Sequence, residues 1–284
     1  MTTSLFLAHC NICGSTNIER YLTVKQYKLV VCKDCGLVFR SHQKIAPQRR
    51  LNESQSVYYS HKYNSRITAK PRDALASLYD WWKADLVIKF LTKSKMLLKG
   101  TKVIDIGCSV GYFLTLARAA GAKVLGIDVS PVAKQLAREM FGIEVEVGEF
   151  PNSFSLSHSK ANLITFNDSF EHLLSPFAAL SKAKKWLSRN GNIFIRTPDI
   201  SYCKNRNSLR KWRLLQPQDH LYFFSGSSLE TLLLLTGFKV IKLTRVSGWI
   251  YVLAESQTKV HVSDSRKQPI DRYLFQEKAR KLRV

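Results

Sequence analysis

Short apolar segments alternate with amphipathic segments along the middle of this 284-residue chain, and this alternation constrains its fold more than any other feature. Apolar stretches of four or five residues recur between residues 103 and 196, and stretches with apolar residues at three- and four-residue spacing separate them. Strand and helix in repeated order predict a parallel sheet covered by helices on both faces. We expect strands at Val103–Ile106, Lys123–Ile127, Ile143–Val147, Leu163–Phe166 and Asn192–Arg196.

The end of this region predicts an antiparallel closure of the sheet. Phe238–Arg245 and Trp249–Ala254 are typical of two strands and are joined by the turn sequence Val-Ser-Gly. Ser130-Pro131 and Ser175-Pro176 are typical helix starts, and Ser227 with Glu230 predicts a capping box for a helix that ends at Gly237. The expected fold is α/β, a Rossmann-like doubly wound sheet of seven strands with an antiparallel closing hairpin.

Four cysteines near the amino terminus form two CxxC pairs with the spacing of a zinc ribbon. Cys10 and Cys13 stand in CNIC, and Cys32 and Cys35 stand in CKDC, eighteen residues further on. A segment of about 40 residues cannot bury enough core to fold alone, and a zinc ion would hold its two turns together. The alternative, two disulfides, does not suit a chain without a secretion signal. We therefore expect a small structural zinc ribbon.

The chain divides into four predicted parts: a ribbon at residues 1–42, a linker and helical segment at 43–98 that packs on the main domain, the main domain at 99–255, and a basic tail at 256–284. The second part contains an aromatic cluster, Tyr58, Tyr59 and Tyr63. A helix from about Asp73 to Leu98 follows, with a predicted inward face of Leu75, Leu78, Trp82, Leu86 and Phe90.

The loop VIDIGCSVGYF follows the first strand of the main domain, where doubly wound sheets bind ligands. Gly107 and Gly111 allow the backbone to approach a ligand, and Asp128 ends the second strand, where a carboxylate can bind a ribose. A dinucleotide loop would need small residues at Ser109 and Tyr112, and a phosphate loop would need GK[ST]. Asp105 is placed to meet a cationic amino group. A ligand with a ribose and an amino-acid end is S-adenosylmethionine (SAM).

Residues from about 99 to 254 resemble a class I SAM-dependent methyltransferase. The stretches VIDIGCSVGYFL, VLGIDVS, VEVGEF and LITFNDSFEHLLSP match the successive motifs of that family, and the ribbon is similar to the amino-terminal module of methyltransferases that act on sugars and related polar metabolites. Two departures stand out: Ser109 replaces a glycine of the loop, and Asn162 replaces an aspartate before the fourth strand.

The resemblance implies roles for particular residues. Asp105, Gly107 and Gly111 would hold the methionine part of SAM, Asp128 the ribose, and Glu149 with the Phe150 backbone the adenine. Asn167 and Asp168 would line the pocket near the methyl group. The loop itself adds the remaining predicted cofactor residues, Cys108, Tyr112 and Phe113.

Methyl transfer requires the acceptor to be positioned and, for a hydroxyl group, to lose a proton. His172 in the FEHL turn and His220 in QDHLYFF are the candidate bases, and a structural role is the alternative for each. Glu171 with His172 is also a candidate pair of ligands for a divalent metal.

The net charge of +23 arises from 44 Lys and Arg against 21 Asp and Glu. A group of cations between the fifth strand and the next helix predicts a substrate carrying phosphate, carboxylate or nucleotide diphosphate: Lys204, Arg206, Arg210, Lys211 and Arg213. The expected acceptor is a polar, anionic small molecule such as an activated or lipid-linked sugar. The alternatives are a ribosomal RNA methyltransferase and a non-catalytic nucleic-acid or membrane adaptor.

The chain has no apolar stretch near the roughly 20 residues that a transmembrane helix needs, and its amino terminus lacks a basic leader. We expect a cytoplasmic protein, with peripheral membrane contact through the basic tail as an option.

Overall fold

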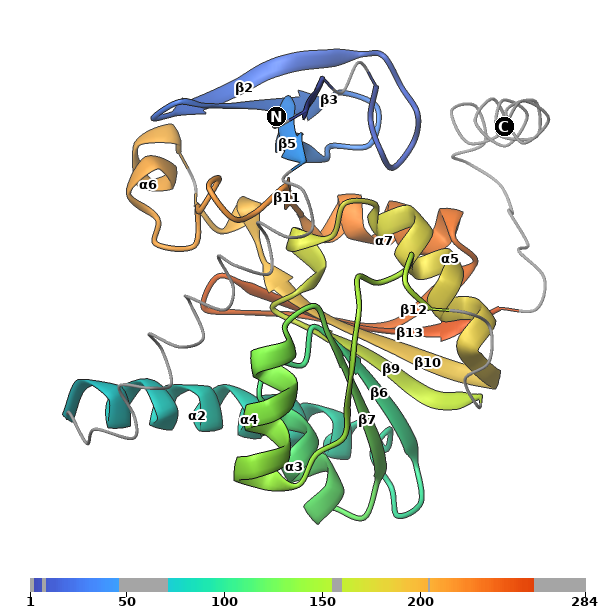
Figure 1. Cartoon of the computed structure of the whole chain (residues 1–284). Coiled ribbons are helices and arrows are strands. Elements are labelled where there is room, and N and C mark those ends of the chain that lie inside the picture. The colour runs from blue at the N-terminus through green and yellow to red at the C-terminus, as the bar shows by residue number, and fades with distance from the viewer. Residues whose placement is uncertain (1–2, 7–8, 46–70, 155–159, 204, 258–284) are drawn as a thin grey trace. The chain divides into compact units, whose positions relative to one another are not determined.

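The computed structural model describes residues 3–6, 9–45, 71–154, 160–203 and 205–257 (Figure 1). Two compact units are present. The first contains residues 45–169 and 182–194, and the second contains residues 3–44, 170–181 and 195 onward. The predicted aromatic cluster at Tyr58, Tyr59 and Tyr63 lies outside the described residues, as does the predicted basic tail beyond Gln257.

A seven-stranded mixed sheet has the strand order β12-β13-β10-β9-β6-β7-β8. The strands β6, β7, β8 and β9 pair in parallel, and β12 and β13 pair antiparallel, which confirms the predicted doubly wound sheet with a closing hairpin. The strand order reverses at β6, because the chain builds outward through β7 and β8 and then returns to place β9 on the other side. The strands are β6 (Lys102–Ile106), β7 (Lys123–Asp128), β8 (Val145–Val147), β9 (Ala161–Asn167), β10 (Leu187–Pro198), β12 (Phe238–Val246) and β13 (Trp249–Ser256).

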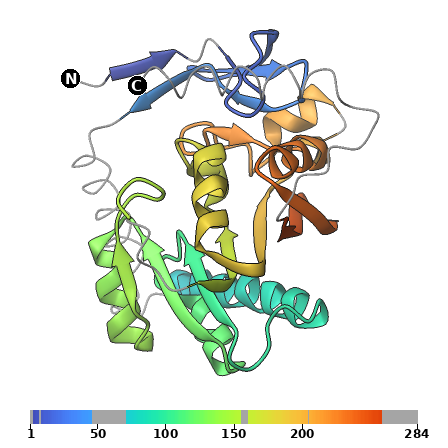
Figure 2. The same cartoon turned by 90° about the vertical axis from the view of Figure 1, so that its right-hand side faces the viewer.

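Helices α3 (Tyr112–Ala119) and α4 (Pro131–Phe141) follow β6 and β7, and both views place these green helices beside β7 and β8 (Figures 1 and 2). The predicted start of α4 is confirmed, since the Ser130 side chain accepts a hydrogen bond from the Ala133 N–H and Pro131 follows. Helix α5 (Pro176–Trp186) begins at the predicted Ser-Pro pair.

The helix before the sheet, α2 (Pro71–Lys93), buries only part of the predicted face. Leu78 and Trp82 are 63% and 53% exposed, and the side chain of Leu75 lies outside the described residues. Leu86 and Phe90 are half-buried, and the ring centroid of Phe90 lies 5.5 Å from that of Phe194 in β10. The fully buried positions are Ala84, Val87 and Leu91. Apolar residues at helical spacing thus form two rows along this helix, the predicted row and a second row that includes the small residue Ala84. The second row packs inward. Accordingly the neighbouring Trp81 contacts α3, with its ring centroid 4.9 Å from that of Tyr112.

The second unit contains a four-stranded sheet in which β11 (Tyr222–Phe223) joins the strands that follow the first cysteine pair, in the order β11-β4-β3-β2. A shared hydrophobic core links these strands to residues 200–223: Leu22, Leu29, Val38, Ile200, Leu209, Leu215 and Phe223. The remaining strands are β2 (Ile18–Val24), β3 (Tyr27–Cys32) and β4 (Val38–Arg40), with β1 (Thr3–Phe6) paired to β5 (His42–Ile45).

This unit also contains the short helices η1 (Phe170–His172), η2 (Ile200–Tyr202) and α6 (Arg206–Lys211), and the longer α7 (Gly226–Leu235). The predicted capping box of α7 was two residues out of place, because Ser225 and Ser228 form it instead of Ser227 and Glu230. Serine at position 228 supplies the reciprocal hydrogen bond that the sequence pattern assigns to a glutamate. None of the helices that the structure describes has the length and apolar character needed to span a membrane.

Gly126 lies in β7, between the loop that follows β6 and strand β8. Little room exists there for a side chain. A Cβ atom there would lie 2.5 Å from Cys108 Sγ and 3.0 Å from Val145 Cγ2. We expect Gly126→Ala to lower the free energy of unfolding by about 1–3 kcal/mol, because buried overpacking forces neighbours to shift. Urea denaturation measures this loss.

The double variant G126A/C108A provides the control, since it removes the nearest atom. Relative to Cys108→Ala alone, the Gly126 substitution should then cost less. An equal cost with and without the sulfur would contradict the packing argument.

Candidate functional site

The loop between β6 and α3 adopts backbone conformations that favour glycine. Gly107 has φ +75° and Gly111, the residue before α3, has φ +86°. A Cβ on Gly107 would collide with Ser169, whose hydroxyl donates to the Ile106 carbonyl. The loop is therefore closed against Ser169 and has no space for a side chain at Gly107, while at Gly111 the left-handed backbone favours glycine.

Ser109 also adopts a left-handed conformation, with φ +53°. Its N–H donates to Asp128 Oδ2 at 2.9 Å, so the serine occupies the conformation expected of the family's glycine.

Asp105 is buried at 2% exposure and is held by two side chains of β9. The parallel register places Thr165 opposite Asp105, and Asn167 follows on the same face of the strand. Thr165 Oγ1 and Asn167 Nδ2 donate to Asp105 Oδ1 at 2.6 and 3.0 Å. Burial raises the pKa of Asp105 to about 7, although both hydrogen bonds act in the opposite direction.

The other end of the Asn167 amide faces a site rather than a protein group. Its Oδ1 is buried, and it has no hydrogen-bond partner among the described residues. A buried amide oxygen normally accepts a hydrogen bond, so this atom indicates the place of a donor from a ligand.

Asp128 ends β7, and both of its oxygens accept from backbone N–H groups. Oδ1 accepts from Ser130 and Oδ2 from Ser109, each at 2.9 Å. Burial raises the pKa of Asp128, and these hydrogen bonds oppose that shift. Asp105, Asp128 and Asn167 thus form an acidic, hydrogen-bond-accepting site that fits a cation carrying hydroxyl groups, as SAM does.

The other predicted cofactor residues take less direct positions. Cys108 is buried against Gly126, and burial raises the pKa of its thiol well above the usual range. Tyr112 and Phe113 are buried in the first turn of α3, and Phe150 packs on Phe166 and Trp186. Glu149 is half-buried directly after β8, and its backbone N–H donates to the Ser153 hydroxyl.

Asp168 lies at the end of β9, with φ +53°. Its Oδ2 forms an ion pair with Lys83 of α2 at 3.2 Å, and Lys83 also contacts Asp80 at 3.4 Å. Neither Lys83 nor Thr165 could be identified as a site residue from the sequence, because each contacts the site only through a partner on a neighbouring element.

The two predicted histidines lie together in the second unit, with ring centroids 4.8 Å apart. His172 is exposed, and its Nδ1 lies 3.1 Å from the Asp219 carbonyl oxygen. His220 is buried, and its Nε2 lies 3.9 Å from Glu171 Oε1. Because a carbonyl can only accept, Nδ1 of His172 carries a hydrogen and Nε2 of the neutral ring is the proton acceptor.

Glu171 completes this group. It is buried, its Oε2 accepts from Thr197 Oγ1 at 2.9 Å, and its carbonyl accepts from the Leu221 N–H. One potential ligand atom from each of Glu171, His172 and His220 lies within 4.8 Å of the others, a spacing compatible with a metal ion as well as with proton transfer.

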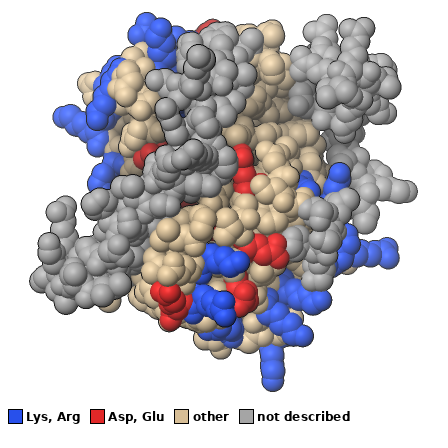
Figure 3. Space-filling model, in the orientation of Figure 1, with Lys and Arg blue, Asp and Glu red and all other residues tan. Residues whose placement is uncertain are grey.

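The predicted substrate cations lie on and around α6. Arg210, Lys211 and Arg213 are exposed, and Arg210 donates to the Thr23 carbonyl of β2 at 2.8 Å. Lys204 and the side chain of Arg206 lie outside the described residues. On the face drawn in Figure 3, the described Lys and Arg side chains form several separate groups with Asp and Glu between some of them.

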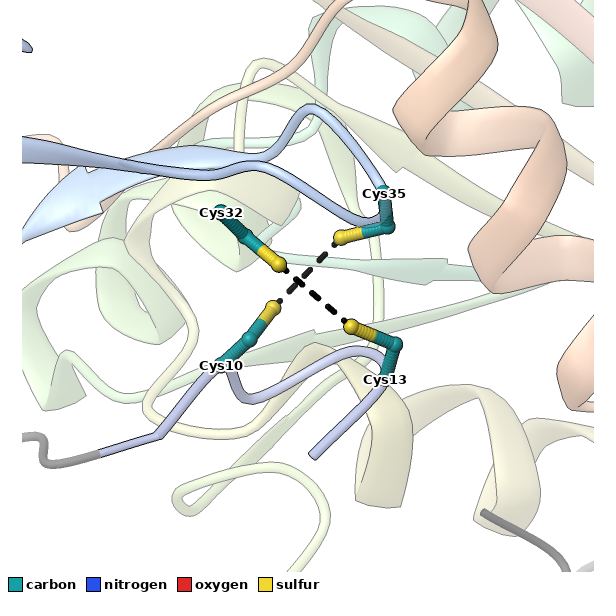
Figure 4. Close-up of side chains that lie close together, drawn as sticks. All are labelled: Cys10, Cys13, Cys32 and Cys35. Carbon is teal, nitrogen blue, oxygen red and sulfur yellow. Dashed lines mark hydrogen bonds between the residues drawn. The ribbon is translucent and has the colours of Figure 1, made fainter. Parts of the chain in front are cut away.

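The four ribbon cysteines converge from two turns (Figure 4). Cys10 and Cys35 sulfurs are 3.5 Å apart, as are those of Cys13 and Cys32, and none of the four forms a disulfide. Ligands on a tetrahedron with Zn–S bonds of about 2.3 Å lie about 3.8 Å apart. The four sulfurs therefore fit a structural zinc ion.

The chain is similar to several known proteins. Residues 63–243 match the Methyltransferase domain family (Methyltransf_23). A ubiquinone biosynthesis O-methyltransferase of Actinobacillus pleuropneumoniae is 29% identical over 109 residues, which is 35% of this chain and 47% of that protein. The chain thus spans about half the length of that relative. A protein of the same name from Xanthomonas euvesicatoria is 25% identical over 221 residues, 68% of this chain and 88% of that one.

Two further similarities come from a more distant relative and a solved structure. A tRNA U34 carboxymethyltransferase of Methylococcus capsulatus is 28% identical over 174 residues, 58% of this chain and 53% of that protein. The structure of magnesium protoporphyrin IX methyltransferase from Synechocystis with bound S-adenosylhomocysteine has the same fold, with a TM-score of 0.57 and 16% identity over 74% of this chain and all of that one. Because the family match covers well over half of the chain, this protein belongs to the Methyltransferase domain family.

Proposed function

We propose that this protein transfers the methyl group of SAM to a hydroxyl oxygen of a polar, anionic small molecule, such as an activated or lipid-linked sugar. The observation that carries the proposal is the pair of buried carboxylates, Asp105 and Asp128, beside the partnerless Asn167 oxygen of the described site. Buried acceptors without a cation are unfavourable. A ligand with an ammonium group and a ribose relieves that cost at each position.

The proposal gives each cofactor residue a role. Asp105 and the Asn167 oxygen bind the SAM ammonium. Asp128 binds the ribose hydroxyls through the lone pairs that do not accept hydrogen bonds from the backbone N–H groups. Glu149 and the Phe150 backbone lie on the adenine side. When bound, SAM supplies a methyl group activated by its sulfonium and leaves as the neutral thioether.

Gly107 and Gly111 bring the loop backbone close to the cofactor, while Cys108, Tyr112 and Phe113 pack behind it. Asp168, oriented by Lys83, faces the methyl side.

His172 is the proposed general base. Its ring is exposed, and the Asp219 carbonyl fixes the tautomer that leaves Nε2 free to take the hydroxyl proton. His220 has the second role: its buried ring packs edge-on against His172 and faces Glu171, so it orients the base. A divalent metal held by these three residues is the alternative use of the same atoms.

The anionic character of the acceptor rests on the exposed cations of α6, because guanidinium groups suit phosphate and carboxylate. The curated relatives named for ubiquinone biosynthesis favour an oxygen acceptor. RNA is the second candidate, supported by the tRNA-modifying relative and the +23 net charge.

The division into ribbon, helical segment, methyltransferase domain and basic tail stays a prediction, as does the cytoplasmic location. Membrane contact through the tail also stays a prediction.

The raised pKa of Asp105 predicts pH-dependent SAM binding. The SAM ammonium requires the carboxylate, so binding below pH 7 must expel the proton that Asp105 holds with a pKa of about 7. The dissociation constant should rise about tenfold per pH unit below 7 and level off above it. Calorimetry in two buffers at pH 6 should detect the released proton.

Two variants test the assignment to Asp105. Asp105→Asn should bind SAM more weakly and lose the pH dependence between 6 and 8. Thr165→Val removes a hydrogen bond that lowers the pKa, and should move the break in the curve to higher pH. A pH profile that is unchanged in Asp105→Asn would contradict the assignment.

The raised pKa of Asp105 also makes the stability of the protein without ligand depend on pH. The folded protein holds the Asp105 proton more tightly than the unfolded chain, whose ordinary value is 3.8, so this group lowers the free energy of unfolding as pH rises from about 4 to about 7.

The proposed base is tested by comparing the two histidines. His172→Ala should reduce kcat at least a hundredfold with SAM affinity within about twofold of wild type, and His220→Ala should cause a smaller loss. The measurement is transfer of tritiated methyl from SAM to UDP-glucose, glucose 1-phosphate and 3,4-dihydroxybenzoate. A larger loss in His220→Ala would reverse the two roles.

The RNA alternative predicts a steep dependence on salt. Transfer RNA is the probe, at 200 mM salt. At this concentration, the affinity of non-specific binding through phosphate contacts is lower by roughly two orders of magnitude or more than at low salt. The small-molecule proposal expects weak binding and no methyl incorporation into the RNA. Incorporation into RNA would favour the second candidate, and SAM binding without transfer to any probe would favour an adaptor.

A further inference from the structure

The ribbon is built into the segment that carries His220. Strand β4 pairs with β11, with Phe39 opposite Tyr222 and Val38 opposite Phe223. The Arg40 N–H donates to the Leu221 carbonyl at 3.0 Å. The residues directly after His220 are therefore the outer strand of the ribbon's own sheet.

A second contact joins the other cysteine turn to the same strand. Tyr222 is fully buried, and its hydroxyl accepts from Asn11 Nδ2, which lies within the CNIC turn. The same hydroxyl donates to the Leu174 carbonyl at 2.9 Å. Leu174 follows His172 by two residues, so one hydroxyl connects the turn to the loop of the other histidine.

Each half of the cysteine cluster thus makes one of these contacts. The first pair encloses Asn11, and the second pair, Cys32 and Cys35, leads through Leu37 into β4. Leu37 and Phe39 are completely buried, so movement of the second turn must move this strand.

The two histidine loops are also joined to one another. Leu221 N–H donates to the Glu171 carbonyl at 2.9 Å, and His172 Nδ1 donates to the Asp219 carbonyl. Tyr222 stands at the junction of these loops with the ribbon. By contrast, the contacts given above for Asp105, Asp128 and Asn167 come from residues 105–169 alone.

We propose that the zinc-bound ribbon positions His172 and His220 through the chain Asn11–Tyr222–Leu174 and through the β4–β11 pairing. Asn11 and Tyr222 are positioning residues, and the metal holds the turn that supports them. Loss of zinc, or oxidation of the cysteines, then disorganises the histidine pair while SAM binding persists. The inference rests on the proposed function only for the catalytic meaning of the histidines, since their placement is measurable separately.

Tyr222→Phe tests the link by deleting the one hydroxyl that serves both contacts. In protein labelled with ¹⁵N-histidine, this variant should shift the ring signals of His172 and His220, with one zinc per chain and a SAM dissociation constant within twofold of wild type. Removing zinc from the wild type with a chelator should shift the same signals. The matched control is Tyr251→Phe, which deletes another buried hydroxyl, one that accepts from Arg196 in β10, and should leave both signals unchanged.

Unchanged ring signals in Tyr222→Phe, or in the zinc-free wild type, overturn the proposal. Should Tyr222→Phe fail to fold, Asn11→Ala breaks the same link from the half-exposed ribbon side, and unchanged ring signals there have the same meaning. If the signals move but methyl transfer does not fall, the positioning stands and the general-base assignment fails.

Discussion

The two hydrogen bonds that Asp128 accepts from backbone N–H groups are the interaction on which the cofactor side depends. They join the loop after β6 to the start of α4 and hold Ser109 at φ +53°. A left-handed conformation costs a non-glycine residue about 1–2 kcal/mol. A buried hydrogen bond to a charged group contributes about 1.5–3 kcal/mol. The carboxylate therefore offsets the strain, and serine is tolerated where the family has glycine.

The same carboxylates decide which ligand the loop accepts. Burial raises the pKa of Asp105 and of Asp128, so the charged form of each carboxylate is disfavoured unless a cation or donor stabilises it. A pyrophosphate brought beside Asp105 would add a further negative charge, whereas an ammonium group removes the conflict. The loop lacks the glycines of a dinucleotide site and contains Asp105, and both features favour a cationic cofactor.

The sequence predicted what depends on local pattern and less of what depends on packing. The approximate strand positions, the Ser130 cap and the loop glycines were predictable because local apolar pattern and turn geometry determine them. The buried face of α2 was not, since Trp81 and Trp82 belong to two equally regular rows and only the position of α3 selects one. The pairing of His172 with His220 was equally hidden, because 47 residues separate His172 from Asp219, whose carbonyl holds it. Nothing in the sequence indicated the contact that Asn11 makes with Tyr222.

The family match begins at residue 63, so the cysteine turns and strands β2 to β4 lie outside it. Asn11 is outside the matched segment and Tyr222 is inside, and their hydrogen bond joins the segment that the family model matches to one that it does not match. Asp105, Asp128 and Asn167, the proposed cofactor residues, all lie inside the matched segment. The proposed base and its partner also lie inside it, but their loops are joined to the ribbon. For that reason the proposal for the acceptor rests on this chain's own contacts more than on the family match.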